Sequence, residues 1–198
     1  MNDQSERMRA IKEEVLNLTG SPLYEERIRT MAYPVIGEGS HEARVMFVGE
    51  APGRNEAETG RPFCGASGRV LDQLLQGIGL DRKAVYVTNV VKDRPPENRD
   101  PTAEEIALYG PFLDRQIDII QPAVIATLGR FSMAYLLRRF DLEAHLATIS
   151  KIHGRPHEAR VPYGTVTIIP LYHPAVAVYD RTRFDELLND FKKLLSYV

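Results

Sequence analysis

Short apolar segments alternate with stretches of helical periodicity along this chain, and this alternation constrains its fold more than any other feature. Four segments are apolar nearly throughout, as strands buried on both faces are: residues 44–49, 84–88, 122–127 and 165–170. Apolar residues at helical spacing mark further segments: residues 4–18, 67–78, 102–120, 130–139 and 182–196. We therefore predict an α/β fold, a three-layer α/β/α sandwich with a central, mainly parallel four-stranded sheet.

The composition fits one globular domain that spans residues 1–198. Hydrophobic residues make up 43% and charged residues 26% of the 198 residues, which supplies enough apolar material for a sizeable core. No run approaches the roughly 20 consecutive apolar residues of a membrane span, and the N-terminus lacks the apolar core and cleavage site of a secretion signal. We therefore expect no membrane association, a cytoplasmic location and, by default, a monomer.

Cysteine content and net charge exclude several classes of function. The single cysteine, Cys64, rules out an internal disulfide and any multi-cysteine metal site built from this chain alone, so we expect no cofactor and no bound metal. A net charge of -2 argues against nonspecific coating of nucleic acid but is compatible with a local footprint. Basic residues gather after position 128, where they form either such a footprint or a solvated surface: Arg130, Arg138, Arg139, Lys151, Arg155 and Arg160.

Polar residues follow the predicted strands at the points where ligands bind in open α/β sheets, beyond the carboxyl ends. Glu50 and Glu56 follow the first strand, Asn89 the second, Arg130 the third and His173 the fourth. Each of them, taken alone, has a structural explanation, such as a turn or a satisfied polar contact. Together they predict one site at which carboxylates, an amide and an imidazole converge.

Several longer motifs surround these residues. They are Val48-Gly-Glu-Ala-Pro-Gly53, Gly60-Arg-Pro-Phe-Cys-Gly65, Thr88-Asn-Val-Val-Lys92, Arg94-Pro-Pro-Glu-Asn-Arg-Asp-Pro101 and His173-Pro-Ala175. In this order and at this spacing they resemble the signature of the family-4 uracil-DNA glycosylases, and the resemblance extends from about residue 11 to the C-terminus. It implies a DNA-repair enzyme that hydrolyses the N-glycosidic bond of uracil and leaves an abasic site, with uracil-containing DNA as its partner.

The resemblance assigns residues to the reading of the base. Such an enzyme flips its target base out of the helix before cleavage. Phe63 matches the aromatic residue on which uracil stacks, and Ala51 in the first motif is expected to line the same site. Asn89 matches the amide that reads the pyrimidine edge, because it can donate to O4 and accept from N3–H, a pattern that cytosine reverses.

The resemblance also assigns residues to bond breaking. Cleavage leaves positive charge on the sugar and negative charge on uracil, so the site needs an electrostatic partner for each. His173 matches the histidine that hydrogen-bonds the departing base oxygen, and a neutral imidazole suffices for this. Glu50 and Glu56 match the acidic positions of the first motif, and we favour Glu56 for handling water and Glu50 as a supporting pocket residue. Ala57 stands where the family often has another acid, which leaves the division of roles among the acids open.

Residues 175–183 match the loop that enters the DNA minor groove and fills the gap left by the flipped base. Ala175, Tyr179 and Arg181 are the expected DNA contacts in this loop, and Arg130 is a further one. The alternative is a simple helix turn that packs on the sheet.

The chain departs from the family at four cysteines that normally bind a four-iron cluster. By spacing, Leu18, Ser21, Asp93 and Tyr109 occupy their positions. Aliphatic and hydroxyl side chains cannot replace thiolate ligands, so we predict no cluster, and we expect a packed contact of Leu18 with Tyr109 to fill the space. Residues 94–100 contain no histidine, so we reject the covalent trapping of the abasic sugar that a related branch of the superfamily performs.

Two other hypotheses remain open. A catalytically inactive damaged-DNA binding module could keep the fold, but a mere binder needs no leaving-group partner such as His173. A nucleotide-binding α/β protein could hold a phosphate on the free amides of residues 65–68. The chain lacks the lysine and dinucleotide fingerprints that would support this second hypothesis.

Overall fold

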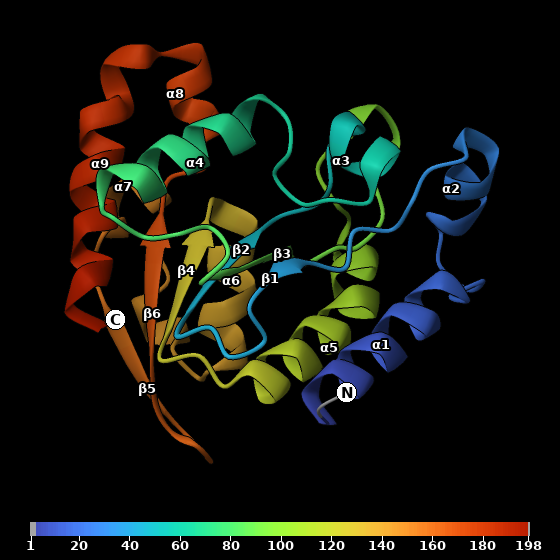
Figure 1. The fold of residues 1–198 in the computed structure, drawn as a ribbon, viewed down its shortest axis with the longest axis horizontal. Coiled ribbons are helices and arrows are strands. Elements are labelled where there is room, and N and C mark those ends of the chain that lie inside the picture. Colours follow the sequence, from blue (N-terminus) through green and yellow to red (C-terminus); the bar gives the residue numbers. More distant parts are fainter. Residues whose placement is uncertain (1–2, 198) are drawn as a thin grey trace.

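A six-stranded sheet forms the centre of the molecule in the computed structural model, which describes residues 3–197 (Figure 1). Its strands are β1 (Glu38–Gly39), β2 (Val45–Gly49), β3 (Tyr86–Asn89), β4 (Val124–Leu128), β5 (His157–Val161) and β6 (Gly164–Leu171). Their order across the sheet is β1-β3-β2-β4-β6-β5. The four inner strands run parallel, and each edge strand is antiparallel to its neighbour.

The predicted mainly parallel α/β sandwich is confirmed, and the four predicted strands are the inner ones. The two edge strands raise the number from four to six. β1 is too short to carry a pattern, and Gly39 runs so close to β3 that a Cβ there would lie 1.9 Å from the carbonyl oxygen of Val85. β5 is mostly solvent-accessible and carries polar residues, so it shows no continuous apolar run.

Helices cover both faces of the sheet (Figure 1). One face carries α1 (Asp3–Leu16), α5 (Ala103–Ile120), α6 (Arg130–Arg139) and α7 (Ile149–Ile152). The other carries α4 (Ala66–Gly77), α8 (Ala175–Tyr179) and α9 (Phe184–Lys192). The remaining elements are α2 (Tyr24–Thr30), α3 (Arg54–Thr59) and the 3-10 turns η1 (Pro96–Asn98), η2 (Glu143–His145), η3 (Arg181–Arg183) and η4 (Lys193–Tyr197). Within residues 3–197, none of these helices is long and apolar enough to cross a membrane.

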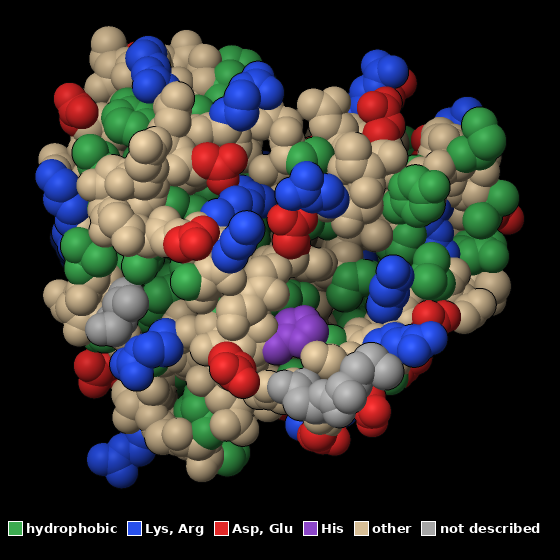
Figure 2. Space-filling model, viewed as in Figure 1, with side chains coloured by type: hydrophobic (Ala, Val, Ile, Leu, Met, Phe, Trp, Pro, Cys, Tyr) green, Lys and Arg blue, Asp and Glu red, His purple; other side chains and the backbone are tan. Residues whose placement is uncertain are grey.

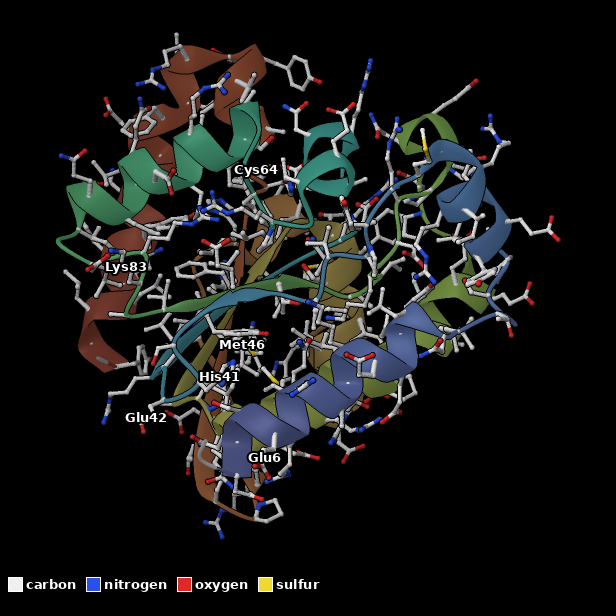
Figure 3. The ribbon with its side chains drawn as sticks, turned by 45° about the vertical axis from the view of Figure 1, so that its right-hand side comes forward. Glu6, His41, Glu42, Met46, Cys64 and Lys83 are labelled. Carbon is white, nitrogen blue, oxygen red and sulfur yellow. The ribbon has the colours of Figure 1, made fainter. Side chains whose placement is uncertain are left out.

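Alternate residues of the buried strands face two separate cores, because successive side chains of a strand point to opposite faces. Phe47 on β2 stacks on Phe191 of α9, with ring centroids 5.6 Å apart. Its neighbour Met46 belongs to the opposite core together with Ile11 of α1, and Figure 3 shows the Met46 side chain between the sheet and α1. A strand buried on both faces requires a helix layer on each side, which accounts for the three layers.

Local sequence signals determine where α5 and the C-terminal helix α9 begin. The backbone amide of Glu105 donates to the Thr102 hydroxyl (3.2 Å) and the amide of Thr102 donates to the Glu105 carboxylate (2.8 Å), so the predicted capping box starts α5. The predicted helix at 182–196 is divided instead. Asp180 accepts from the amide of Thr182 (3.0 Å) and starts η3, and α9 begins only at Phe184.

Candidate active site

A pocket of about 340 Å³ lies at the carboxyl ends of the parallel strands, where the segments after β2, β3 and β6 meet. Figure 1 shows α3 on one side of this region and α4 and α8 on the other, and Figure 2 shows the molecular outline indented between these parts at the top of the view. Seven of the predicted site residues line the pocket: Glu50, Ala51, Glu56, Phe63, Asn89, His173 and Ala175. The structure thus brings an aromatic ring, an amide, an imidazole and two carboxylates from distant parts of the chain around one cavity.

Phe63 and Asn89 form one wall of the pocket, on either side of Gly49. Gly49 pairs with Asn89 in the register of β2 and β3. A Cβ at Gly49 would lie 2.3 Å from Asn89 Oδ1 and 2.7 Å from the edge of the Phe63 ring, so only glycine lets both groups approach this point. Phe63 adopts a left-handed backbone conformation (φ 48°), a strained state for an aromatic residue that is common at binding sites.

Glu56 holds the turn that carries Phe63. Its Oε1 accepts hydrogen bonds from the amides of Cys64 (3.0 Å) and Gly65 (2.9 Å), just before α4 begins (Figure 3). Oε2 has no hydrogen-bond partner within residues 3–197 and remains available to the pocket that Glu56 lines. The Gly65 amide is already bound by the Glu56 carboxylate, and a Cβ at Gly68 would lie 1.8 Å from the carbonyl oxygen of Phe63, so these two glycines serve the packing of the turn.

The imidazole of His173 is neutral and holds its proton on Nε2. The backbone amide of Ala175 donates to Nδ1 (3.1 Å), so Nδ1 must be the unprotonated nitrogen. Burial lowers the pKa of His173 to about 4, although the carboxylate of Glu56 works in the opposite direction. The ring lies 5.6 Å from that of Phe63, centroid to centroid. At neutral pH the pocket therefore contains a neutral histidine with one N–H bond free to donate.

Glu50 is a half-buried carboxyl group at the end of β2. Its pKa is raised to about 7, chiefly by burial and also by the charge of Asp100, while the guanidinium of Arg130 acts in the opposite direction. Its protonation therefore changes near neutral pH, a property that buried carboxyl groups at active sites share.

The predicted DNA contacts other than Ala175 lie outside the pocket. Tyr179 stands at the end of α8 with 91% of its surface exposed. Arg181 donates to Gln73 (3.0 Å), and Arg130 pairs with Asp100 and lines a neighbouring groove between α5 and α6. Figure 2 shows Lys, Arg, Asp and Glu side chains interspersed on one face of the molecule.

The pocket also contains residues to which the sequence assigned no role: Pro52, Gly53, Ser67, Pro95, Asn98 and Arg99. The last three come from Arg94-Pro-Pro-Glu-Asn-Arg-Asp-Pro101, a motif that carries part of the family resemblance but to which no site role was assigned. Glu97 and Asn98 both have positive φ angles, 55° and 56°, which turn this segment toward the pocket. Arg99 is held there by the buried carboxylate of Glu105. The motif could have indicated that this segment belongs to the site. The positive φ angles that turn it toward the pocket could not be predicted from the sequence.

The four positions that match the cluster cysteines lie together and do not line the pocket. The Tyr109 hydroxyl donates to Asp93 (2.5 Å) and lies 2.7 Å from the hydroxyl of Ser21, so Ser21 is the donor in that bond. Arg27, another buried residue, donates to both carboxylate oxygens of Asp93 (2.9 and 3.1 Å). Leu18 packs against the apolar core cluster to which Tyr109 belongs, and a buried hydrogen-bond network joins the other three positions.

These side chains do not fit a four-iron cluster. They offer no thiolate, and the one carboxylate among them, Asp93, is already bound by Arg27 and Tyr109. Elsewhere in the described part of the chain, residues 3–197, no group of three or more His, Cys, Asp or Glu residues is placed to hold a metal ion.

Comparison with known proteins agrees with this geometry. Residues 36–196 match the family model of the uracil DNA glycosylase superfamily. The type-4 uracil-DNA glycosylase of Sulfurisphaera tokodaii is 45% identical over 185 residues, 93% of this chain and 81% of the relative. That of Archaeoglobus fulgidus is 45% identical over 166 residues (84% and 82%), and that of Thermotoga maritima 39% over 202 residues (100% and 98%). The chain therefore belongs to the uracil DNA glycosylase superfamily and, within it, to the type-4 uracil-DNA glycosylases.

Proposed function

We propose that this protein is a DNA-repair glycosylase that hydrolyses the N-glycosidic bond of uracil in DNA and leaves an abasic site. The observation that carries the proposal is the meeting of Phe63, Asn89 and His173 around one pocket of about 340 Å³. A base can reach these groups only after it has left the DNA stack. The protein has no need of a cofactor for this chemistry, because its own side chains supply each electrostatic partner.

Phe63 and Asn89 select the base. Uracil stacks on the Phe63 ring, and the Asn89 amide donates to O4 and accepts from N3–H. Cytosine presents a donor and an acceptor in the reverse order, so it would leave both polar groups of Asn89 unpaired in a buried site. Discrimination by unpaired buried polar groups is strong. The close approach of both side chains at Gly49 supports this assignment.

His173 and the two glutamates break the bond. The Nε2–H of His173 donates to the oxygen of the departing uracil, because the Ala175 amide occupies Nδ1. Glu56 orients the attacking water through Oε2 and opposes the positive charge that develops on the sugar, and Glu50 supports it. Removal of one such stabilising group lowers the rate roughly 100-fold or more.

The surface around the pocket holds the DNA. Tyr179 enters the minor groove and fills the gap left by the flipped base, with Ala175 beside it. Arg181 and Arg130 contact phosphates. The local nature of this footprint suits a chain whose net charge is -2.

An excision assay tests the proposal. The protein is incubated with uracil-containing oligonucleotides, single-stranded or with U·G or U·A pairs, and abasic sites are then cleaved with alkali. We expect cleavage by wild type and a roughly 100-fold or greater loss in His173→Ala and Glu56→Gln. His145→Ala and Glu58→Gln are matched controls, since both residues lie outside the pocket, and they should retain activity.

Two outcomes would contradict the proposal. Tight binding to these oligonucleotides without any strand cleavage would favour the inactive damaged-DNA binding module. Full activity in both His173→Ala and Glu56→Gln would leave the family unchanged but would show that the assigned residues do not perform the chemistry.

A further inference from the structure

Lys92 is a buried lysine that the proposed chemistry does not use. Its side chain is fully buried and does not line the pocket. The ammonium nitrogen Nζ donates to the carbonyl oxygen of Asn89 (2.7 Å), the hydroxyl of Thr88 (2.9 Å) and Oε1 of Gln116 (2.6 Å). Each of the three N–H bonds of the ammonium form therefore meets an acceptor.

This cation is costly to the fold. Within residues 3–197, the partners of Lys92 are neutral oxygen atoms, and burial lowers its pKa to about 7. Burying a charge without a counter-ion is unfavourable, and a methionine would fill a similar volume without that penalty. A titratable group with a strongly shifted pKa next to an active site indicates a functional role when its contacts also connect it to that site.

Two of the three acceptors are fixed by a rigid frame. Gln116 on α5 donates to the carbonyl of Ile36 (2.9 Å) and to the hydroxyl of Tyr86 (3.1 Å). Thr88 also donates to the carbonyl of Ile36 (2.6 Å). The frame thus joins β3, α5 and the segment before β1, and a fully satisfied buried network of this kind holds its members rigidly. The remaining bond of the ammonium group, to Asn89, is the one that reaches the pocket wall.

Asn89 depends on its backbone for its position. Its side-chain amide has no hydrogen-bond partner within residues 3–197, and β3 ends at this residue. The amide is also closely confined, as the 2.3 Å between Oδ1 and a Cβ built on Gly49 shows. A small movement of the Asn89 backbone therefore moves the amide relative to a bound base.

We propose that Lys92 is a positioning residue, which holds the carbonyl of Asn89 so that the Asn89 amide keeps the orientation that binds uracil. The inference rests on the proposed function, because it takes Asn89 as the base-reading residue. In this role Lys92 contacts neither base nor DNA. It controls the affinity of the pocket for uracil and leaves the affinity of the surrounding surface for DNA unchanged.

Binding of free uracil tests this role, because it requires no turnover. Lys92→Met keeps an unbranched apolar stem and removes the three donors. The isosteric control Thr88→Val removes one acceptor but keeps the bond to Asn89. Ligand-observed NMR measures uracil affinity, and a gel-shift assay measures affinity for abasic-site DNA. We expect Lys92→Met to lose uracil affinity roughly 10- to 100-fold, with Thr88→Val close to wild type and abasic-site binding unchanged in both.

A second variant covers the case in which Lys92→Met does not fold. Lys92→Gln has an amide nitrogen one atom too close to the backbone to reach Asn89, and it should show the same selective loss. Wild-type uracil affinity in a folded Lys92 variant, or an equal loss in Thr88→Val, overturns the proposal. A wild-type protein that binds uracil without excising it contradicts the proposed function alone.

Discussion

The buried ion pair between Arg27 and Asp93 makes a quantitative prediction. Arg27→Met keeps an apolar side chain of similar length but leaves the Asp93 carboxylate, whose side chain is 1% exposed, with the Tyr109 hydroxyl as its only remaining partner within residues 3–197. Arg27 also donates to the carbonyls of Val15 (3.1 Å) and Leu16 (2.7 Å) at the end of α1. The substitution therefore removes the anchor of the N-terminal helices as well as a counter-ion.

Breaking a buried pair by removing one partner lowers the free energy of unfolding by about 3–5 kcal/mol. For a domain of this size each kcal/mol shifts Tm by roughly 2–4 °C, so we expect Arg27→Met to lower Tm by roughly 6–20 °C. Thermal unfolding followed by circular dichroism measures the shift. A double-mutant cycle with Asp93→Asn should give a coupling free energy of about 0.5–3 kcal/mol.

Arg29→Met is the matched control on the same helix. Arg29 pairs with Glu26 (2.7 Å) at the surface, and its side chain is 72% exposed, so its loss should change the free energy of unfolding by less than about 1 kcal/mol. Equal stability of Arg27→Met and Arg29→Met would refute the idea that the buried network holds this part of the fold. A coupling free energy of zero in the cycle would refute the pairing itself.

Three other predictions concern the pocket and its rim. Gly49→Ala places a methyl group between Asn89 and Phe63, so uracil excision should fall roughly 100-fold. A kcat/KM equal to that of wild type would show that no base binds between these two side chains. Tyr179→Ala should change the free energy of unfolding by less than about 0.5 kcal/mol, because the side chain is exposed. It should impair excision from duplex DNA more than from single strands, which have no gap to fill. The pKa of Glu50 in the folded protein is raised to about 7, above its ordinary value of 4.5. Its negative charge therefore destabilises the fold above pH 7, and this destabilisation is lost as the pH falls toward 4.5. Glu50→Gln should raise Tm at pH 8 and leave it unchanged near pH 4.

The inner sheet was predictable from the sequence, and its edges were not. A parallel strand covered on both faces is apolar nearly throughout, so the apolar runs at 44–49, 84–88, 122–127 and 165–170 coincide with β2, β3, β4 and β6. An edge strand has no such requirement: β5 carries His157, Glu158 and Arg160, and β1 has only two residues. The pairing of these strands depends on contacts between distant segments, which local patterns do not encode.

The chemical groups of the site were predictable, but the contacts that place them were less so. Phe63, Asn89 and His173 were indicated by motifs and by their positions after strands. The double hydrogen bond from the Cys64 and Gly65 amides to Glu56 was not, because a backbone N–H group belongs to every residue except proline and leaves no mark in a sequence. The same reason hides the bond from the Ala175 amide to the imidazole, which fixes the position of its proton.

The buried ion pair and the pocket meet in three consecutive residues. Lys92 donates to the carbonyl of the base-reading asparagine, Asp93 accepts from Arg27, and Arg94 donates to Asn98 (2.7 Å), which lines the pocket. Since neighbouring Cα atoms are a fixed distance apart, Asp93 cannot move without moving both sides of the pocket. The segment therefore needs an anchor whatever its chemistry, and in this chain a carboxylate bound by Arg27 provides it. Loosening that anchor should impair excision through local opening, so the activity lost in Arg27→Met should increase with temperature well below its Tm.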